Sequence, residues 1–147
     1  MVAKAFSIED GDQQGLTLVG ARKRVYKDID LTFAKRVDND VFKKQNAAAV
    51  KQSVKNILMT NYMEKPFQPF FGGNMSDFLF ELNDGIEDEE VEERIQSAIV
   101  TYEPRAEVLD VKVISNPDNY DISATVTFKV VSTSEEVTLN LSLTRLR

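Results

Sequence analysis

The sequence predicts an α+β protein in which about three helices pack on one face of a small, mainly antiparallel sheet that ends in a C-terminal meander. Apolar residues recur at helical spacing over residues 46–60, 75–82 and 87–102, and at alternate positions beyond residue 105. Between the two patterns stands Tyr102-Glu103-Pro104-Arg105, where Pro104 lacks a backbone N–H and disfavours the α conformation at Glu103. We therefore expect one domain over residues 26–147, preceded by an N-terminal arm over residues 1–25.

The amino-acid composition restricts the reactions, metal sites and partners that this chain can support. The 147 residues include no Cys and no His, which excludes disulfides and thiolate metal sites and removes the commonest general base near neutral pH. A net charge of -6 opposes broad nucleic-acid binding. No apolar run approaches the roughly 20 residues of a membrane span, and the N-terminus lacks a signal-peptide pattern. We expect a soluble protein made in a cytoplasm, with no cofactor, metal, nucleic acid or membrane as a partner.

The arm contains three glycines and a basic cluster at residues 22–24. It lacks sustained periodicity, which indicates a mobile or partner-ordered arm. The basic cluster indicates either a solvated segment or a contact for an acidic partner. The alternation from residue 26 to residue 33 predicts a short strand or extended segment laid on the core through Ile29, Leu31 and Phe33. The polar residues 34–45 are predicted to form a loop.

The first helix is expected over Asn46–Thr60, with Asn46 as its N-cap. Its polar face, with Lys51, Gln52 and Lys55, is expected to face water. The apolar stripe of the same helix is expected to face the core and consists of Ala47, Val50, Val54, Ile57 and Leu58.

Residues 61–74 hold two prolines, two glycines and four aromatic residues. The prolines and glycines preclude regular structure. The aromatic residues leave two interpretations open, a packed loop that closes the core or an exposed aromatic anchor for a partner.

A short helix is predicted over Met75–Leu82, and a third helix opens with six acids in seven positions over residues 87–93. Acids near a helix N-terminus interact favourably with the macrodipole, which is the structural interpretation of this run. A metal site is not expected, because consecutive helical side chains point around the axis and do not converge on one ion.

Three strands are predicted after Arg105, joined by turn signals at residues 116–119 and 132–134. The inward residues of the first strand are Leu109, Val111 and Val113. Those of the second strand are Ile122, Ala124, Val126, Phe128 and Val130. Those of the third strand are Val137, Leu139, Leu141 and Leu143.

Glycoside hydrolysis is the one reaction that the composition leaves open, since it needs only two carboxylates at a suitable separation. Glu81, Asp84 and Glu103 are candidates, although 24 acids in 147 residues supply such a pair by chance. A sheet of Thr- and Ser-rich strands with at least one open edge instead suggests an assembly component that pairs with another chain.

An ordered series of motifs carries a family resemblance. The motifs are Ala49–Thr60, Glu64-Lys65-Pro66-Phe67, Phe71-Gly72, Leu79-Phe80-Glu81 and Tyr102-Glu103-Pro104-Arg105. Together, over about residues 28–131, they resemble the baseplate wedge and sheath-initiator family of contractile phage tails. The same family includes the baseplate component of type VI secretion systems.

The resemblance implies a structural protein, not an enzyme, that is located in the virion tail baseplate after assembly in the host cytoplasm. Its implied partners in a large symmetric hetero-oligomer are the core bundle of the wedge, the tail sheath protein and proteins near the tail hub or tube. Glu103, Pro104 and Arg105 are the implied contacts with the core bundle. The sheet is implied to initiate the sheath by strand pairing, for which the last strand offers Leu139, Leu141 and Leu143.

This sequence departs from the family pattern at Met63 and Lys65, where the family usually has Gly and Arg, and at Leu82, where Pro is common. Lys65 remains a candidate partner contact, but it keeps only the charge and not the planar fork of Arg. Three alternatives stay open: a type VI secretion baseplate subunit, a small lysozyme-like carboxylate glycosidase and a soluble regulatory adaptor.

Overall fold

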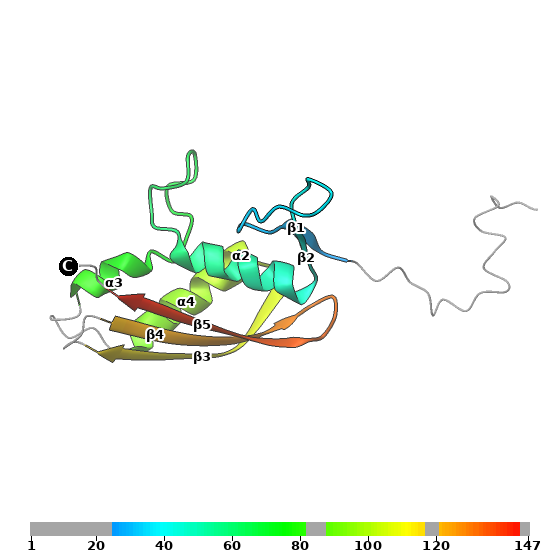
Figure 1. Ribbon diagram of the computed structural model, residues 1–147. Helices are drawn as coiled ribbons and strands as arrows, with labels where there is room; N and C mark the ends of the chain where they lie inside the picture. Colours follow the sequence, from blue (N-terminus) through cyan, green and yellow to red (C-terminus); the bar gives the residue numbers. More distant parts are fainter. Residues whose placement is uncertain (1–24, 82–87, 117–120, 145–147) are drawn as a thin grey trace, which may run out of the picture.

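The computed structural model describes residues 25–81, 88–116 and 121–144. A two-stranded antiparallel ribbon comes first, made of β1 (Lys27–Ile29) and β2 (Lys43–Gln45). Three helices follow, α2 (Ala47–Met59), α3 (Met75–Glu81) and α4 (Asp88–Tyr102), and then three strands, β3 (Ala106–Asn116), β4 (Asp121–Val130) and β5 (Glu136–Thr144). Figure 1 shows the helices on one face of the β3–β4–β5 sheet. The predicted α+β class is confirmed.

The C-terminal sheet is the predicted meander, because its strand order is β3-β4-β5 and both pairings are antiparallel. Val126 in the central strand lies opposite Val111 on one side and Leu139 on the other. All five predicted inward residues of β4 are buried, as are Leu139 and Leu141 of β5. Period-two alternation therefore predicted these two strands correctly.

The prediction for Leu109 is wrong, since its side chain is 49% exposed. A β-bulge between Val108 and Asp110 adds one residue to β3 relative to β4. An extra residue reverses the inward and outward phase, so Val108 packs against the core in place of Leu109.

The core lies between the sheet and the helices. The stripe of α2 is buried as predicted at Val50, Val54, Ile57 and Leu58, with Ala47 packed at its edge. Val91, Ile95, Ala98 and Ile99 form the buried face of α4.

Two details of α2 differ from prediction. Asn46 occupies the N-cap position and its carbonyl accepts from Val50 N–H (3.0 Å), but its side chain makes no capping hydrogen bond. Gln52 was predicted to face water, yet it is only 8% exposed. Its Nε2 donates to the Ile29 carbonyl (2.8 Å), so the ribbon covers this side chain and gives it a partner.

The expected strand on the core is also wrong. Only Lys27–Ile29 are extended, and they pair with residues 43–45, which were predicted to be loop. Ile29, Leu31 and Phe33 are 51%, 48% and 67% exposed. The alternation reflects a strand, but its partner is a three-residue strand outside the core, so Ile29, Leu31 and Phe33 remain exposed.

Several predictions lie outside the described residues, namely the arm up to residue 24, Leu82, Asp84, Glu87 and the centre of the turn at residues 117–119. Met75–Glu81 of the predicted second helix is confirmed as α3. Within the described part of the chain, no helix is long and apolar enough to cross a membrane.

Replacing Phe128 tests the placement of the core. Phe128 is fully buried (0% exposed), so Phe128→Ala should lower the free energy of unfolding. The expected loss is about 3–5 kcal/mol, measured by urea unfolding. Ile114→Ala is the matched control on β3, where the side chain is 70% exposed. It should stay within about 0.5 kcal/mol, and equal losses for the two variants would contradict this core.

Candidate functional site

The corner at residues 103–105 joins α4 to the sheet through its backbone. Glu103 N–H donates to the Ile99 carbonyl (2.8 Å), which continues the helical pattern by one residue. The Glu103 carbonyl accepts from Ala106 N–H (3.1 Å), and the Arg105 carbonyl accepts from Val131 N–H (3.0 Å). Backbone hydrogen bonds therefore hold Glu103 to α4 before the turn and to Ala106 after it, and they hold Arg105 to Val131.

The side chains of Glu103 and Arg105 bind each other. Arg105 Nε lies 2.5 Å from Glu103 Oε1, and Arg105 Nη2 lies 2.6 Å from Oε2. Glu103 is 2% exposed, whereas Pro104 is exposed and the Arg105 side chain is 32% exposed. The guanidinium carbon also lies 5.2 Å from the centre of the Tyr26 ring. The arrangement is a two-pronged ion pair whose acid is buried and whose cation reaches the surface.

Burial of Glu103 would raise the pKa of its carboxyl, but hydrogen bonds from Arg105 and Ser53 and the Arg105 charge outweigh that effect and lower it. The Glu103 carboxylate in turn raises the pKa of Arg105. A glycosidase acid needs a raised pKa, so Glu103 is unsuited to that role. The side chains of the other two acid candidates, Glu81 and Asp84, lie outside the described residues.

Lys65 is linked to this corner through aromatic rings. Its Nζ lies 3.8 Å from the centre of the Phe71 ring, and that ring lies 4.8 Å from the Tyr102 ring. The Tyr102 hydroxyl donates to the Phe70 carbonyl (2.7 Å). Lys65 and Tyr102, the residue directly before the corner, are far apart in sequence but therefore belong to one connected group of side chains.

Two acids of α4 protect the outer edge of β3. Glu92 Oε1 accepts from Val113 N–H (2.9 Å), and Asp88 Oδ1 accepts from Ser115 N–H (3.2 Å). Asp88, Glu89 and Glu90 occupy the first turn of α4, which is where the predicted interaction of the acidic run with the helix dipole requires them. The role at the strand edge was not predicted, because it depends on which strand lies beside the helix.

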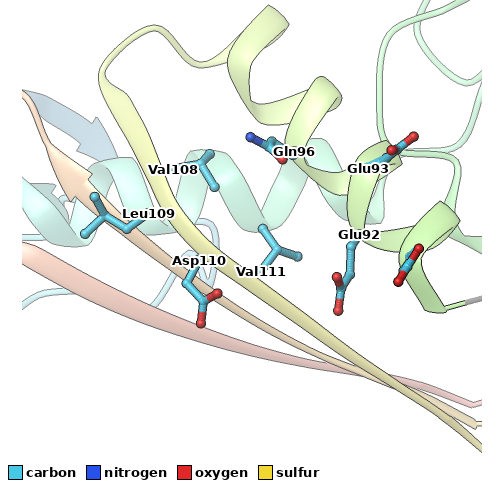
Figure 2. Close-up of a pocket in the computed structure, with 8 residues that line it drawn as sticks. Glu92, Glu93, Gln96, Val108, Leu109, Asp110 and Val111 are labelled. Atoms are coloured by element: carbon cyan, nitrogen blue, oxygen red, sulfur yellow. The ribbon is translucent and has the colours of Figure 1, made fainter.

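A groove of about 400 Å³ runs between α4 and β3 next to these contacts. Figure 2 shows Glu92, Glu93 and Gln96 on the helix side and Val108 to Val111 on the strand side. Among the described residues, no group of three or more His, Cys, Asp or Glu side chains is arranged to hold a metal ion.

The outer edge of β5 follows from the register. In an antiparallel strand both backbone groups of a residue point to the same side, and that side alternates. Because Val113 faces α4, Lys112 faces β4 and bonds to its partner Thr125. Asn140, which lies on the other side of Thr125, must then point away from β4.

The same alternation gives Thr138 and Ser142 outward backbone groups, and Lys51 Nζ donates to the Thr138 carbonyl (2.7 Å) from outside the sheet. No partner within the described residues bonds to the backbone of Asn140 or Ser142 at this edge. Leu139 and Leu141 are instead buried (4% and 7% exposed) and bond to β4, and Leu143 packs against the core. The residues available for strand pairing are therefore the polar neighbours of the three leucines.

The lowered pKa of Glu103 predicts acid-dependent stability. The contribution of Glu103 is complete above its ordinary value of 4.5 and is lost as pH falls through the lower folded-state value. Urea unfolding from about pH 7 to about pH 3 should show stability falling with pH below the ordinary value, less steeply in Glu103→Gln than in the wild type. The exposed Glu107→Gln is the control and should keep the wild-type slope. An unchanged slope in Glu103→Gln would contradict the ion pair.

Comparisons with known proteins agree with the fold and with the motifs. A family model described as baseplate wedge protein gp25 matches residues 44–135. Baseplate wedge protein gp25 of Enterobacteria phage T4 is 32% identical over 114 residues, which cover 78% of this chain and 86% of that protein.

Two solved structures are also similar. A chain of the 6-fold symmetrised cryo-EM structure of the anti-feeding prophage baseplate has a TM-score of 0.62 at 27% identity, covering 73% of this chain and 86% of that one. A crystal structure from Geobacter sulfurreducens, named as a proposed tail lysozyme, has a TM-score of 0.53 at 20% identity, covering 67% of this chain and 89% of that one. The latter likeness shows the fold alone. The resemblance found in the sequence motifs is confirmed, and the chain belongs to the baseplate wedge protein gp25 family.

Proposed function

We propose that this protein docks on the core bundle of the wedge through Pro104 and Arg105, and that it initiates sheath assembly by strand pairing along β5. Family membership makes the chain a structural component of a contractile-tail baseplate. The proposal concerns how it performs that role, and the observation that carries it is the partly exposed cation held by a buried acid at the corner.

The geometry of Arg105 supports docking. Arginine carries five N–H donors, and the ion pair uses one on Nε and one on Nη2. Nη1 makes no hydrogen bond within the described residues, so its donors can meet a carboxylate or carbonyl of the core bundle. Glu103 fixes the guanidinium before the partner arrives, which reduces the entropy lost on binding. Glu103 thus acts by positioning Arg105, while exposed Pro104 supplies an apolar contact.

The β5 edge supports strand pairing. Asn140 and Ser142 present outward backbone groups, and their side chains lie on the exposed face of the sheet. A strand of the sheath protein can add there by main-chain hydrogen bonds. The Thr138 carbonyl already accepts a hydrogen bond from Lys51, so the added strand would pair with residues 140–144 and end near Thr138.

Lys65 fits the same scheme as a secondary contact near the corner. Its exposed ammonium lies above the Phe71 ring, which fixes its position without a carboxylate partner within the described residues. The partners in this scheme are other wedge proteins, the sheath protein and proteins near the hub or tube, in a virion tail assembled in the host cytoplasm. A type VI secretion baseplate is the alternative, and neighbouring genes for a phage tube and capsid would separate the two.

The corner is tested best by a double variant. Arg105→Ala alone leaves a buried carboxylate without its cation and should cost about 1.5–3 kcal/mol of folding stability. Glu103→Gln with Arg105→Gln removes both charges together, so we expect a smaller stability loss but no incorporation into the wedge. Coexpression with the wedge proteins of the same genome, followed by purification of the wedge, measures incorporation. Normal incorporation of the folded double variant would assign both residues a structural role only.

The β5 edge is tested by Ser142→Pro. The Ser142 N–H points away from β4, so proline removes an edge donor without removing a bond of the β4–β5 ladder. We expect a folded baseplate component that no longer starts sheath growth, as seen by electron microscopy of tails. Thr127→Ala, on the central strand, is the matched control and should permit growth. Sheath of normal length on Ser142→Pro baseplates would rule out pairing at this edge.

A further inference from the structure

We propose that the side of α2 opposite the sheet is a second docking surface, which binds an acidic partner segment that also carries apolar side chains. The α2 surface is defined by exposed residues of α2 and of the two loops that flank it. They are Phe33, Lys55, Met59, Met63, Phe67 and Phe70. The inference does not rest on the docking roles of Arg105 or β5, because none of these residues belongs to the corner or to the sheet.

The three most unusual residues of this surface combine backbone strain with exposure. Phe33, Met63 and Phe67 have φ values of 50°, 69° and 65°, in the left-handed region that bulky side chains rarely adopt. Their side chains are 67%, 79% and 102% exposed. Neither property stabilises the isolated fold, and strain of this kind clusters at ligand-binding sites.

The loop that carries Met63 and Phe67 is held firmly at its base. Met63 N–H donates to the Pro69 carbonyl (2.8 Å), which closes the tip. The Asn61 backbone and side-chain amides both donate to the Glu64 carboxylate (2.9 and 3.0 Å). At the other end of the loop, Gly73 N–H donates to the Ile57 carbonyl (2.9 Å). Phe67 is therefore presented by a fixed loop, which lowers the entropy cost of using it as an anchor.

The loop also resolves the two interpretations of the aromatic connection. Phe71 packs against the core and against the tilted ring of Tyr102, as expected for a packed loop. Phe67 and Phe70 are exposed (102% and 74%), as expected for an anchor. One segment therefore contains both a buried aromatic base and an exposed aromatic tip.

The charge of the surrounding residues indicates an acidic occupant. Residues 27–65 contain eight Lys or Arg and five Asp or Glu, although the whole chain carries a net charge of -6. Asp30, Asp38 and Asp40 pair with Lys44, Arg36 and Lys43, which leaves five cations and two acids of this range outside the ion pairs of the described residues. Lys55 lies on the exposed side of α2 without an ion-pair partner among the described residues. An acidic segment would complement this excess and be steered toward it.

The position of the α2 surface favours a contact separate from those of the corner and the β5 edge. Figure 1 shows the loop after α2 and the loop between β1 and β2 rising from the same side of α2, away from the sheet. The exposed phenylalanines and the interspersed acids favour a protein segment over nucleic acid, since phosphates would meet those acids.

The test uses the full chain and two matched peptide probes. The probes have the same length and the same leucine and phenylalanine residues, and they differ only in carrying Glu or Lys at the polar positions. Backbone amide NMR shifts should saturate with the Glu probe and map to residues around Met63, Phe67 and Lys55. The Lys probe should bind at least about tenfold more weakly.

Variants of exposed residues separate this surface from the rest of the molecule. Met63→Ser with Phe67→Ser, and separately Lys55→Glu, should each weaken the Glu probe by about tenfold or more while the fold is retained. Leu109→Ser with Ile114→Ser removes two exposed apolar side chains of β3 and should leave binding unchanged. Equal binding of both probes, shifts that map elsewhere, or tighter binding of single-stranded DNA would each overturn the proposal.

Discussion

The buried carboxylate of Glu103 is the constraint from which the arrangement of helices and sheet follows. A carboxylate that is 2% exposed needs a cation and hydrogen bonds to remain ionised, and Arg105 supplies both from only two residues away. The intervening Pro104 turns the chain so that the two side chains can meet. Because the backbone of Glu103 bonds into α4 and that of Arg105 bonds to Val131 beside the sheet, the ion pair also fixes the direction in which β3 leaves the helix.

That direction decides which sheet edge is covered. The corner returns β3 alongside α4, so Asp88 and Glu92 reach the outer N–H groups of β3. These contacts use donors with which another strand would have paired, a known way of protecting an edge. On the opposite edge, the described contact is that of Lys51 with the Thr138 carbonyl. The asymmetry between the two edges therefore originates in the helix-to-strand corner.

Local periodicity predicted the elements that bury one continuous face, which are α2, α4, β4 and β5. It failed where a distant or additional residue changed the environment. A single bulge residue turned Leu109 outward, and the carbonyl of Ile29, which lies 23 positions away, gave Gln52 a buried partner. The exposed alternation of β1 has the same pattern as a buried strand, so no sequence pattern could reveal that its partner would be β2. The corner was located correctly, but the internal pairing of Glu103 with Arg105 depends on a turn geometry that spacing does not encode.

In the proposed docking, the internal ion pair and the external contact use different atoms of one guanidinium. The Glu103 carboxylate takes Nε and one N–H of Nη2, while Nη1 stays available at a side chain that is one-third exposed. An unpaired surface arginine would lose considerable rotamer freedom on binding, whereas one already held by a buried acid and stacked near Tyr26 loses little. A residue that stabilises the isolated fold can thus also bind a partner better than an unpaired arginine would, because its side-chain entropy has already been lost during folding. Stability and recognition at this corner are consequently expected to depend on the same pair, with Glu103 acting only through Arg105.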